Sequence, residues 1–110
     1  MAADDIGVRG AVCAAGATAK TVELTAPVRE VRVVNNHATQ YACVSVAEGS
    51  FVANPATTAV VGDDNLVYVP PQTSKVVWRN PKIRKLVNLS IIASGATTPC
   101  YVEGSDWLSS

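Results

Sequence analysis

The sequence is poor in the residues that enzyme catalysis most often uses. It contains one histidine, His37, and three cysteines, Cys13, Cys43 and Cys100, whose spacing does not match a metal site. A serine or cysteine nucleophile would need His37 as its base, yet this residue follows two asparagines in a segment typical of an exposed turn. The sequence has no glycine-rich phosphate loop and no dinucleotide-binding motif. We therefore expect a protein that is not an enzyme and that binds no cofactor and no metal ion.

Charged residues are also scarce. They make up 16% of the chain, with nine basic and nine acidic residues and a net charge of zero, whereas soluble domains average about 25%. The absence of a basic excess argues against direct nucleic-acid binding, which depends on such an excess. No apolar stretch approaches the roughly 20 residues that a membrane helix needs, so we expect no membrane partner. A surface with so little charge favours a protein that is partly covered by a partner.

The chain begins with small and acidic residues, including Asp4 and Asp5. A signal peptide would instead begin with basic residues and continue with an apolar run. We therefore expect synthesis in the cytoplasm, where cysteines stay reduced, and we interpret the three cysteines as small buried side chains. The adjacent Asp63 and Asp64 have too few oxygen ligands around them for a calcium loop, so they indicate an ordinary acidic loop.

Residues that favour β-strands are abundant. The chain has 18 valines, 9 threonines and 4 isoleucines, but only 5 leucines and 2 glutamines. Short apolar runs alternate with turn residues, which predicts an all-β fold: a single antiparallel β-sandwich over residues 1–110 with short terminal arms. A jelly roll is one architecture of this kind. About eight or nine short strands are expected, at 6–14, 18–25, 28–34, 39–47, 51–59, 66–69, 74–79, 86–92 and 97–102.

The clearest pattern covers residues 28–47. Polar and apolar residues alternate over 28–34 and again over 39–47, and the intervening Asn-Asn-His-Ala is a turn sequence. We therefore predict that 28–47 forms a β-hairpin. The core is expected to collect one face of each strand, namely Val22, Leu24, Val31, Val33, Val44, Val46, Val76, Trp78, Val87, Leu89 and Ile91.

The basic residues are unevenly distributed. Five of the nine fall within residues 75–85, which include no acidic residue. A cluster of this kind suits an acidic protein surface. Recognition of single-stranded nucleic acid would also require interleaved aromatic residues, and Trp78 is the only one nearby. We predict that this segment contacts a partner protein through Arg79, Lys82, Arg84 and Lys85. The alternative is that it is an ordinary solvated loop.

The two ends of the chain supply further candidate contacts. Trp107 and Leu108 lie outside any strand pattern. An apolar pair in a tail either folds back on its own domain or anchors a neighbouring subunit, as aromatic residues often do. The acidic Asp4 and Asp5 at the other end complete the set of predicted interaction residues.

Five segments follow one another in a characteristic order: VRVVNN at 31–36, ATQYACV at 38–44, VPPQTS at 69–74, IASGAT at 92–97 and CYVEG at 100–104. This layout resembles the small β-sandwich accessory structural proteins of tailed-bacteriophage virions, of the capsid cement or decoration type. The resemblance implies a virion protein that clamps neighbouring major capsid subunits and stabilises the head. Its partners would be the major capsid protein and further copies of itself in a homotrimer, and it would have no catalytic residues.

Two other functions remain open. One is a head–tail neck, tail or head-fibre component of the same kind of virion. The other is a carbohydrate-binding β-sandwich module, which would need exposed aromatic side chains on a flat face or in a loop cluster. The chain has six aromatic residues, and most of them lie in strand patterns. Copy number per particle would separate the first alternative from a decoration protein, and glycan binding would identify the second.

Overall fold

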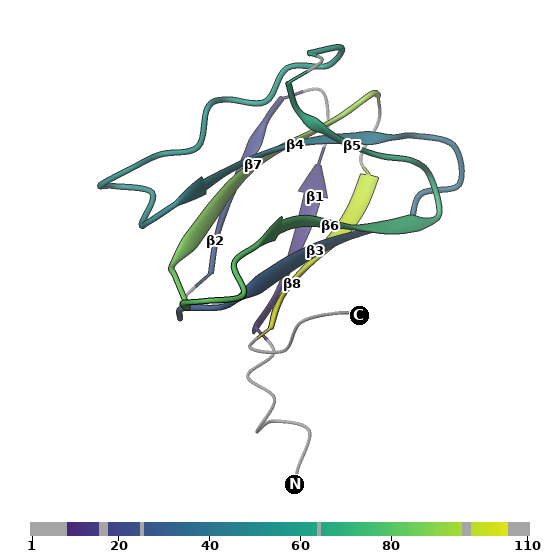
Figure 1. Ribbon diagram of the computed structural model, residues 1–110. Helices are drawn as coiled ribbons and strands as arrows, with labels where there is room; N and C mark the ends of the chain where they lie inside the picture. Colours follow the sequence, from purple (N-terminus) through teal and green to yellow (C-terminus); the bar gives the residue numbers. More distant parts are fainter. Residues whose placement is uncertain (1–8, 16–17, 25, 64, 96–97, 106–110) are drawn as a thin grey trace, which may run out of the picture.

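The fold is known from a computed structural model, which describes residues 9–15, 18–24, 26–63, 65–95 and 98–105. These residues form eight β-strands (Figure 1). None of the described residues belongs to a helix that could cross a membrane. The strands are β1 (Arg9–Ala15), β2 (Lys20–Glu23), β3 (Glu30–Asn35), β4 (Ala42–Glu48), β5 (Val67–Val69), β6 (Thr73–Arg79), β7 (Val87–Ala93) and β8 (Thr98–Ser105).

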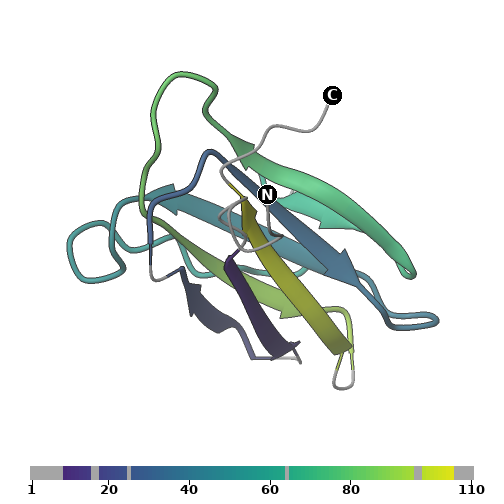
Figure 2. The same cartoon turned by 90° about the horizontal axis from the view of Figure 1, so that it is seen from below.

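The strands form two antiparallel sheets, with the orders β1-β8-β3-β6 and β2-β7-β4-β5. Strand β1 pairs with β8, β2 with β7, β3 with β6, and β4 with β5, so that the pairs are nested and alternate between the two sheets. This is the topology of a jelly roll. Figure 2 shows the first sheet from purple β1 through yellow β8 and blue β3 to green β6. The sandwich expected from the sequence is therefore confirmed, and its topology is that of a jelly roll.

The core lies between the two sheets. Eight of the eleven predicted core residues belong to its buried cluster, and Val46 and Trp78 pack against this cluster while half-buried. Burial of each large aliphatic side chain contributes about 1.5–3 kcal/mol. The buried cluster consists of Val22, Leu24, Val28, Val31, Val33, Ala42, Val44, Val69, Val87, Leu89, Ile91, Ala93, Cys100 and Val102.

The prediction for Val76 is wrong because β6 is irregular. Val31 pairs with Trp78, but the next residue of β3 pairs with Val76, so Val77 is the extra residue of a β-bulge. A shift of one residue exchanges the two faces of a strand. As a result, Val77 packs against the core beside Trp78, and Val76 is absent from the core cluster.

The predicted β-hairpin over 28–47 is also wrong, because its two strands belong to different sheets. Strand β3 pairs with β6 and β8, whereas β4 pairs with β5 and β7. The chain between them crosses from one sheet to the other. Alternation along a strand indicates which side chains face the core, but it does not indicate which strand lies alongside. Both strands therefore show the expected alternation without being hydrogen-bonded to each other.

The crossing is organised by the side chain of Asn35, which is fully buried. Its Nδ2 donates to the carbonyl oxygens of Gln40 at 2.9 Å and Val69 at 3.2 Å, and its Oδ1 accepts from the amide of His37 at 2.9 Å. The ring Nδ1 of His37 then accepts from the amides of Thr39 and Gln40, both at 3.0 Å. Side-chain groups thus satisfy the backbone polar groups that a hairpin ladder would otherwise pair.

One predicted strand is absent from the structure, and another extends beyond its predicted end. Residues 51–59 form turns and irregular chain and no strand, so the described residues contain eight strands. Strand β8 continues to Ser105, three residues beyond the predicted end, because Glu103, Gly104 and Ser105 pair with β3.

Candidate docking surface

The connection between β4 and β5, described at residues 49–63 and 65–66, lies over the outer face of the β2-β7-β4-β5 sheet. We call it the covering segment. The outward side chains of β7 hold it in place: Asn88 Oδ1 accepts from the amide of Ala56 at 2.7 Å, and Ser90 Oγ accepts from the amide of Ala59 at 2.9 Å. Asn88 Nδ2 also donates to the carbonyl oxygens of Gly49 and Asn54, at 3.0 and 2.9 Å. The polar side chains of β7 are buried for this reason.

A second, smaller apolar cluster forms under the covering segment. Cys43 from β4, Ile92 from β7 and Ala59 from the segment are buried together. The half-buried side chains of Tyr41 and Leu66 pack against them. The covering segment therefore buries part of the outer face of this sheet.

The covering segment exposes apolar side chains on its other side. Val52 is 92% exposed, and Phe51 is 40% exposed. The connection between β6 and β7 also exposes apolar side chains, namely Ile83 and Leu86. Contiguous patches of exposed apolar side chains are typical of interaction sites. Among the described residues, the exposed large hydrophobic side chains are Phe51, Val52, Val60, Val61, Tyr68, Ile83 and Leu86.

Two loops, 49–54 and 80–86, adjoin at one end of the sandwich, toward the left of Figure 1. The amide of Gly49 donates to the carbonyl of Leu86 at 2.6 Å. An open hollow of about 430 Å³ lies between the loops, lined by Glu48, Gly49, Asn54, Lys85 and Leu86. We call this end of the molecule the docking surface. Its exposed side chains include Phe51, Val52, Lys82, Ile83, Arg84 and Leu86.

The carboxylate of Glu48 links the parts of the docking surface. Its Oε2 accepts from the indole Nε1 of Trp78 at 3.1 Å, and its Oε1 lies 3.4 Å from Nζ of Lys85. Glu48 ends β4 and Trp78 lies in β6, so this carboxylate bridges the two sheets. Both members of the ion pair are partly exposed, at 45% and 40%, and the pair therefore contributes little to stability.

The structure brings three of the four predicted basic residues to the surface near this end. Arg79, Lys82 and Arg84 are exposed. Lys85 differs, because its side chain pairs with Glu48 and its backbone exchanges hydrogen bonds with Val28, both at 2.9 Å. Lys85 thus anchors the loop. The predicted contacts at Asp4, Asp5, Trp107 and Leu108 lie outside the described residues.

The turn at Asn80 presents the basic side chains. Its Oδ1 accepts from the amides of Lys82 and Ile83, at 3.0 and 3.2 Å, which is a local cap typical of asparagine. The amide of Asn80 donates to the carbonyl of Arg29 at 2.8 Å. Lys82 and Ile83 are therefore held on an ordered turn.

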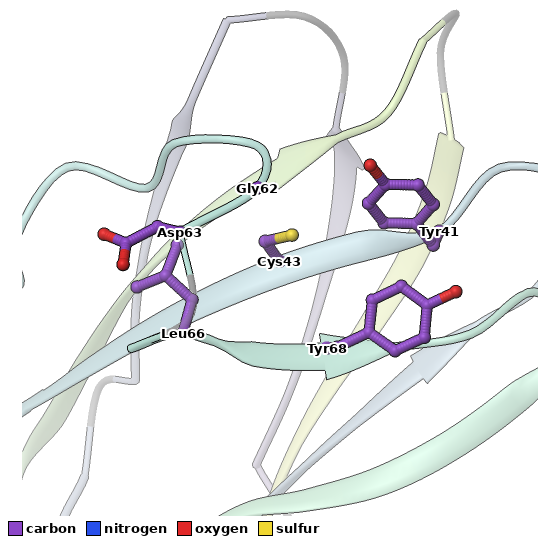
Figure 3. A pocket seen from close by; sticks show the side chains of 6 residues that line it. All are labelled: Tyr41, Cys43, Gly62, Asp63, Leu66 and Tyr68. Atoms are coloured by element: carbon purple, nitrogen blue, oxygen red, sulfur yellow. The ribbon is translucent and has the colours of Figure 1, made fainter.

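A second hollow lies at the opposite end of the outer face, where the covering segment meets β5. It has a volume of about 310 Å³ and is lined by Tyr41, Cys43, Gly62, Asp63, Leu66 and Tyr68 (Figure 3). The rings of Tyr41 and Tyr68 are 4.9 Å apart between centroids and tilted by 50°. In Figure 3 the hydroxyls of Tyr41 and Tyr68 point in different directions, and the Asp63 carboxylate points away from both rings.

Among the described residues, no group of three or more His, Cys, Asp or Glu side chains is placed so that it could hold a metal ion. His37 is engaged with backbone amides in the crossing between the sheets. Asp63 Oδ1 accepts from the amide of Asn65 at 2.9 Å, which is a local turn contact.

No family model matches the sequence, and no match is found among the curated proteins. Among solved structures, the chain is similar to a protein named PirA, with a TM-score of 0.50 and 14% sequence identity. The similarity covers 88% of this chain and 93% of PirA. At this level of identity, the likeness concerns the fold alone.

The predicted interaction residues include the exposed Lys82 and Arg84 of this surface but none of its exposed apolar residues. Phe51 and Val52 were assigned to a strand, and Ile83 was noted only as part of the basic loop. The signal that could have found them is the run from Glu48 to Pro55, where two large apolar residues stand among turn-forming residues.

Proposed function

We propose that the chain is a non-enzymatic virion protein: a capsid decoration protein that clamps neighbouring major capsid subunits. The observation that supports this proposal best is the docking surface, where exposed apolar and basic side chains share one end of the sandwich. Phe51, Val52 and Ile83 provide apolar contact area there, and Lys82 and Arg84 provide positive charge. A partner that fits this surface presents apolar residues with an acidic rim.

The composition and the fold agree with this proposal. The net charge is zero and few residues are charged, which suits a protein that buries much of its surface in an assembly. Jelly rolls are frequent among viral capsid domains, although the fold alone does not define a function. In the proposed mechanism each contact is weak. Many copies on a lattice, together with self-association in a homotrimer, raise the effective concentration and make the clamp stable.

The decisive experiment measures binding to particles that lack this protein. Purified protein is added to such particles, and bound protein is quantified against the major capsid protein. The double variant Lys82→Glu/Arg84→Glu is expected to bind roughly tenfold more weakly, because charge reversal turns attraction to an acidic rim into repulsion. Lys85 is left unchanged, since a glutamate there would face Glu48 and disturb the loop itself.

A matched control carries the same change in net charge at other exposed lysines. Lys20→Glu/Lys75→Glu alters β2 and β6 outside the loops of the docking surface. This control should bind like the unmodified protein. Equal occupancy for both double variants would remove the basic loop from the interface, and binding of no variant at all would refute the decoration role.

A neck, tail or head-fibre role predicts a different number of copies of this protein per particle. A decoration protein is present in proportion to the major capsid protein, whereas a neck or tail component forms a small ring at one vertex. Quantitative protein ratios in purified particles separate these two roles. Light scattering of the purified protein tests the homotrimer.

The hollow beside Tyr41 and Tyr68 favours a second candidate function, which is carbohydrate binding. Tyr68 is 46% exposed, and the two tilted rings with their hydroxyls combine apolar faces with hydrogen-bonding groups. A glycan array with the unmodified protein and with Tyr68→Ala tests this role. Binding that disappears in Tyr68→Ala would support it, and no binding above background would exclude it for the glycans on the array.

A further inference from the structure

Cys13 and Cys100 are directly opposite each other in neighbouring antiparallel strands. Cys13 belongs to β1 and Cys100 to β8, and the register pairs the two residues, with Val12 opposite Tyr101 on one side and Ala14 opposite Pro99 on the other. Figure 2 shows these two strands, purple and yellow, side by side along their length. The sequence places the two cysteines 87 residues apart, so only the fold brings them together.

This register position suits a disulfide bond. Directly opposite residues in an antiparallel pair share a face of the sheet, and their Cα atoms are about 4.5–5.5 Å apart. Disulfides form between residues whose Cα atoms are about 4.4–6.8 Å apart. Cys100 is a thiol in the core, 1% exposed. The third cysteine, Cys43, lies in the other sheet under the covering segment, away from this register.

We propose that Cys13 and Cys100 form a cross-strand disulfide when the protein meets a small-molecule disulfide such as oxidised glutathione. One thiolate attacks the glutathione disulfide, and a mixed disulfide forms as the first glutathione thiolate leaves. The other cysteine thiolate then attacks the protein sulfur of the mixed disulfide, and the second glutathione thiolate leaves. Two protein thiols are oxidised, one glutathione disulfide is reduced, and the two protons end on the two glutathione thiols.

The position of β1 makes Cys100 reachable. Strand β1 is the edge strand of its sheet and is hydrogen-bonded there to β8 alone. Local detachment of an edge strand requires less free energy than global unfolding. Opening of β1 would expose the Cys100 thiol to the reagent, and closure would return the two cysteines to their opposite positions.

The disulfide would join the first and last strands and close a loop that contains most of the chain. Cross-links that close long loops restrict the unfolded state most strongly. The melting temperature of the oxidised protein is therefore expected to rise by roughly 10 °C. This inference rests on the register of β1 and β8 and does not depend on the proposed decoration role.

The test is oxidation of the full-length protein followed by mapping of its disulfides. The protein is incubated with oxidised glutathione in mild urea, blocked with an alkylating reagent and digested with trypsin. Each cysteine then falls in a different peptide: 10–20, 33–75 or 86–110. We expect the 10–20 and 86–110 peptides to be linked in monomeric protein, while the 33–75 peptide carries the alkyl group.

Variants make the result unambiguous. Cys43→Ser should retain both the link and the rise in melting temperature, whereas Cys13→Ser should lose both. Cys13→Ser also avoids a change at the buried Cys100, so the test does not depend on a variant that fails to fold. Three alkylated cysteines after oxidation, persistent glutathione on Cys13 or Cys100, or a link that involves the 33–75 peptide would each overturn the proposal.

Discussion

The side-chain oxygen of Asn88 accepts a hydrogen bond from the backbone amide of Ala56 at 2.7 Å, across 32 residues of sequence. Asn88 is fully buried, and its Nδ2 makes two further hydrogen bonds to the backbone of the covering segment. One asparagine on the outer face of β7 therefore fixes the loop that carries Phe51 and Val52. The docking surface depends on this contact, although Asn88 itself does not reach the surface.

Replacement of Asn88 tests this dependence. Asn88→Ala removes one acceptor and two donors from a buried site and leaves backbone groups without partners. The free energy of unfolding should therefore fall by about 2–4 kcal/mol. The amides of Ala56 and Ala59 should lose protection from hydrogen exchange before the core strands do. The control is Asn36→Ala at an exposed position. An equal and small loss of stability in both variants would contradict the anchoring role.

A second prediction concerns the crossing between the sheets. Asn35→Asp keeps an oxygen that can accept from the amide of His37, but it loses the two donors to the carbonyls of Gln40 and Val69. It also places a buried carboxylate next to two carbonyl oxygens, which is strongly unfavourable. We expect Asn35→Asp to lose more stability than Asn35→Ala at neutral pH. Urea denaturation measures the difference, and the reverse order would show that the amide donors contribute little.

The bridge made by Glu48 should be weak and sensitive to salt. Glu48→Gln removes the charge that pairs with Lys85 but keeps an oxygen for the indole of Trp78, so the loss of stability should be below about 1 kcal/mol. Glu48→Lys should reduce stability more than Glu48→Gln does, because it places a second positive charge next to Lys85. The difference between these two variants should shrink in 1 M salt, where the screening length is about 3 Å. A difference that salt leaves unchanged would point to packing instead of charge.

The bulge in β6 predicts an inequality between two adjacent valines. Both valines are half-buried, but Val77 packs against the core cluster and Val76 does not belong to it. Val77→Ala should therefore destabilise the protein by about 1–2 kcal/mol, and Val76→Ala by clearly less. Thermal unfolding of both variants under one condition provides the comparison. A larger effect at Val76 would mean that β6 is regular in solution.

Alternation along the strands predicted much of the fold. The scarcity of leucine and the abundance of valine indicated strands, and the inner faces of β3, β4 and β7 were correct, including Val33, Val44 and Leu89. The basic turn after Asn80 was likewise visible in the sequence, because charge and turn residues are local properties. These features depend on residues that are close together in the chain.

Only the tertiary structure decided which strands are neighbours. The alternation of β3 and β4 is the same in a hairpin and in a crossing between sheets, since both bury one face of each strand. Asn88 and Ser90 read as exposed polar residues until the covering segment is placed over them. The same is true of Cys13 and Cys100, whose opposition follows from the pairing of the first and last strands. Sequence periodicity determines the faces of strands, but long-range packing determines their partners, because pairing between distant segments leaves no local pattern.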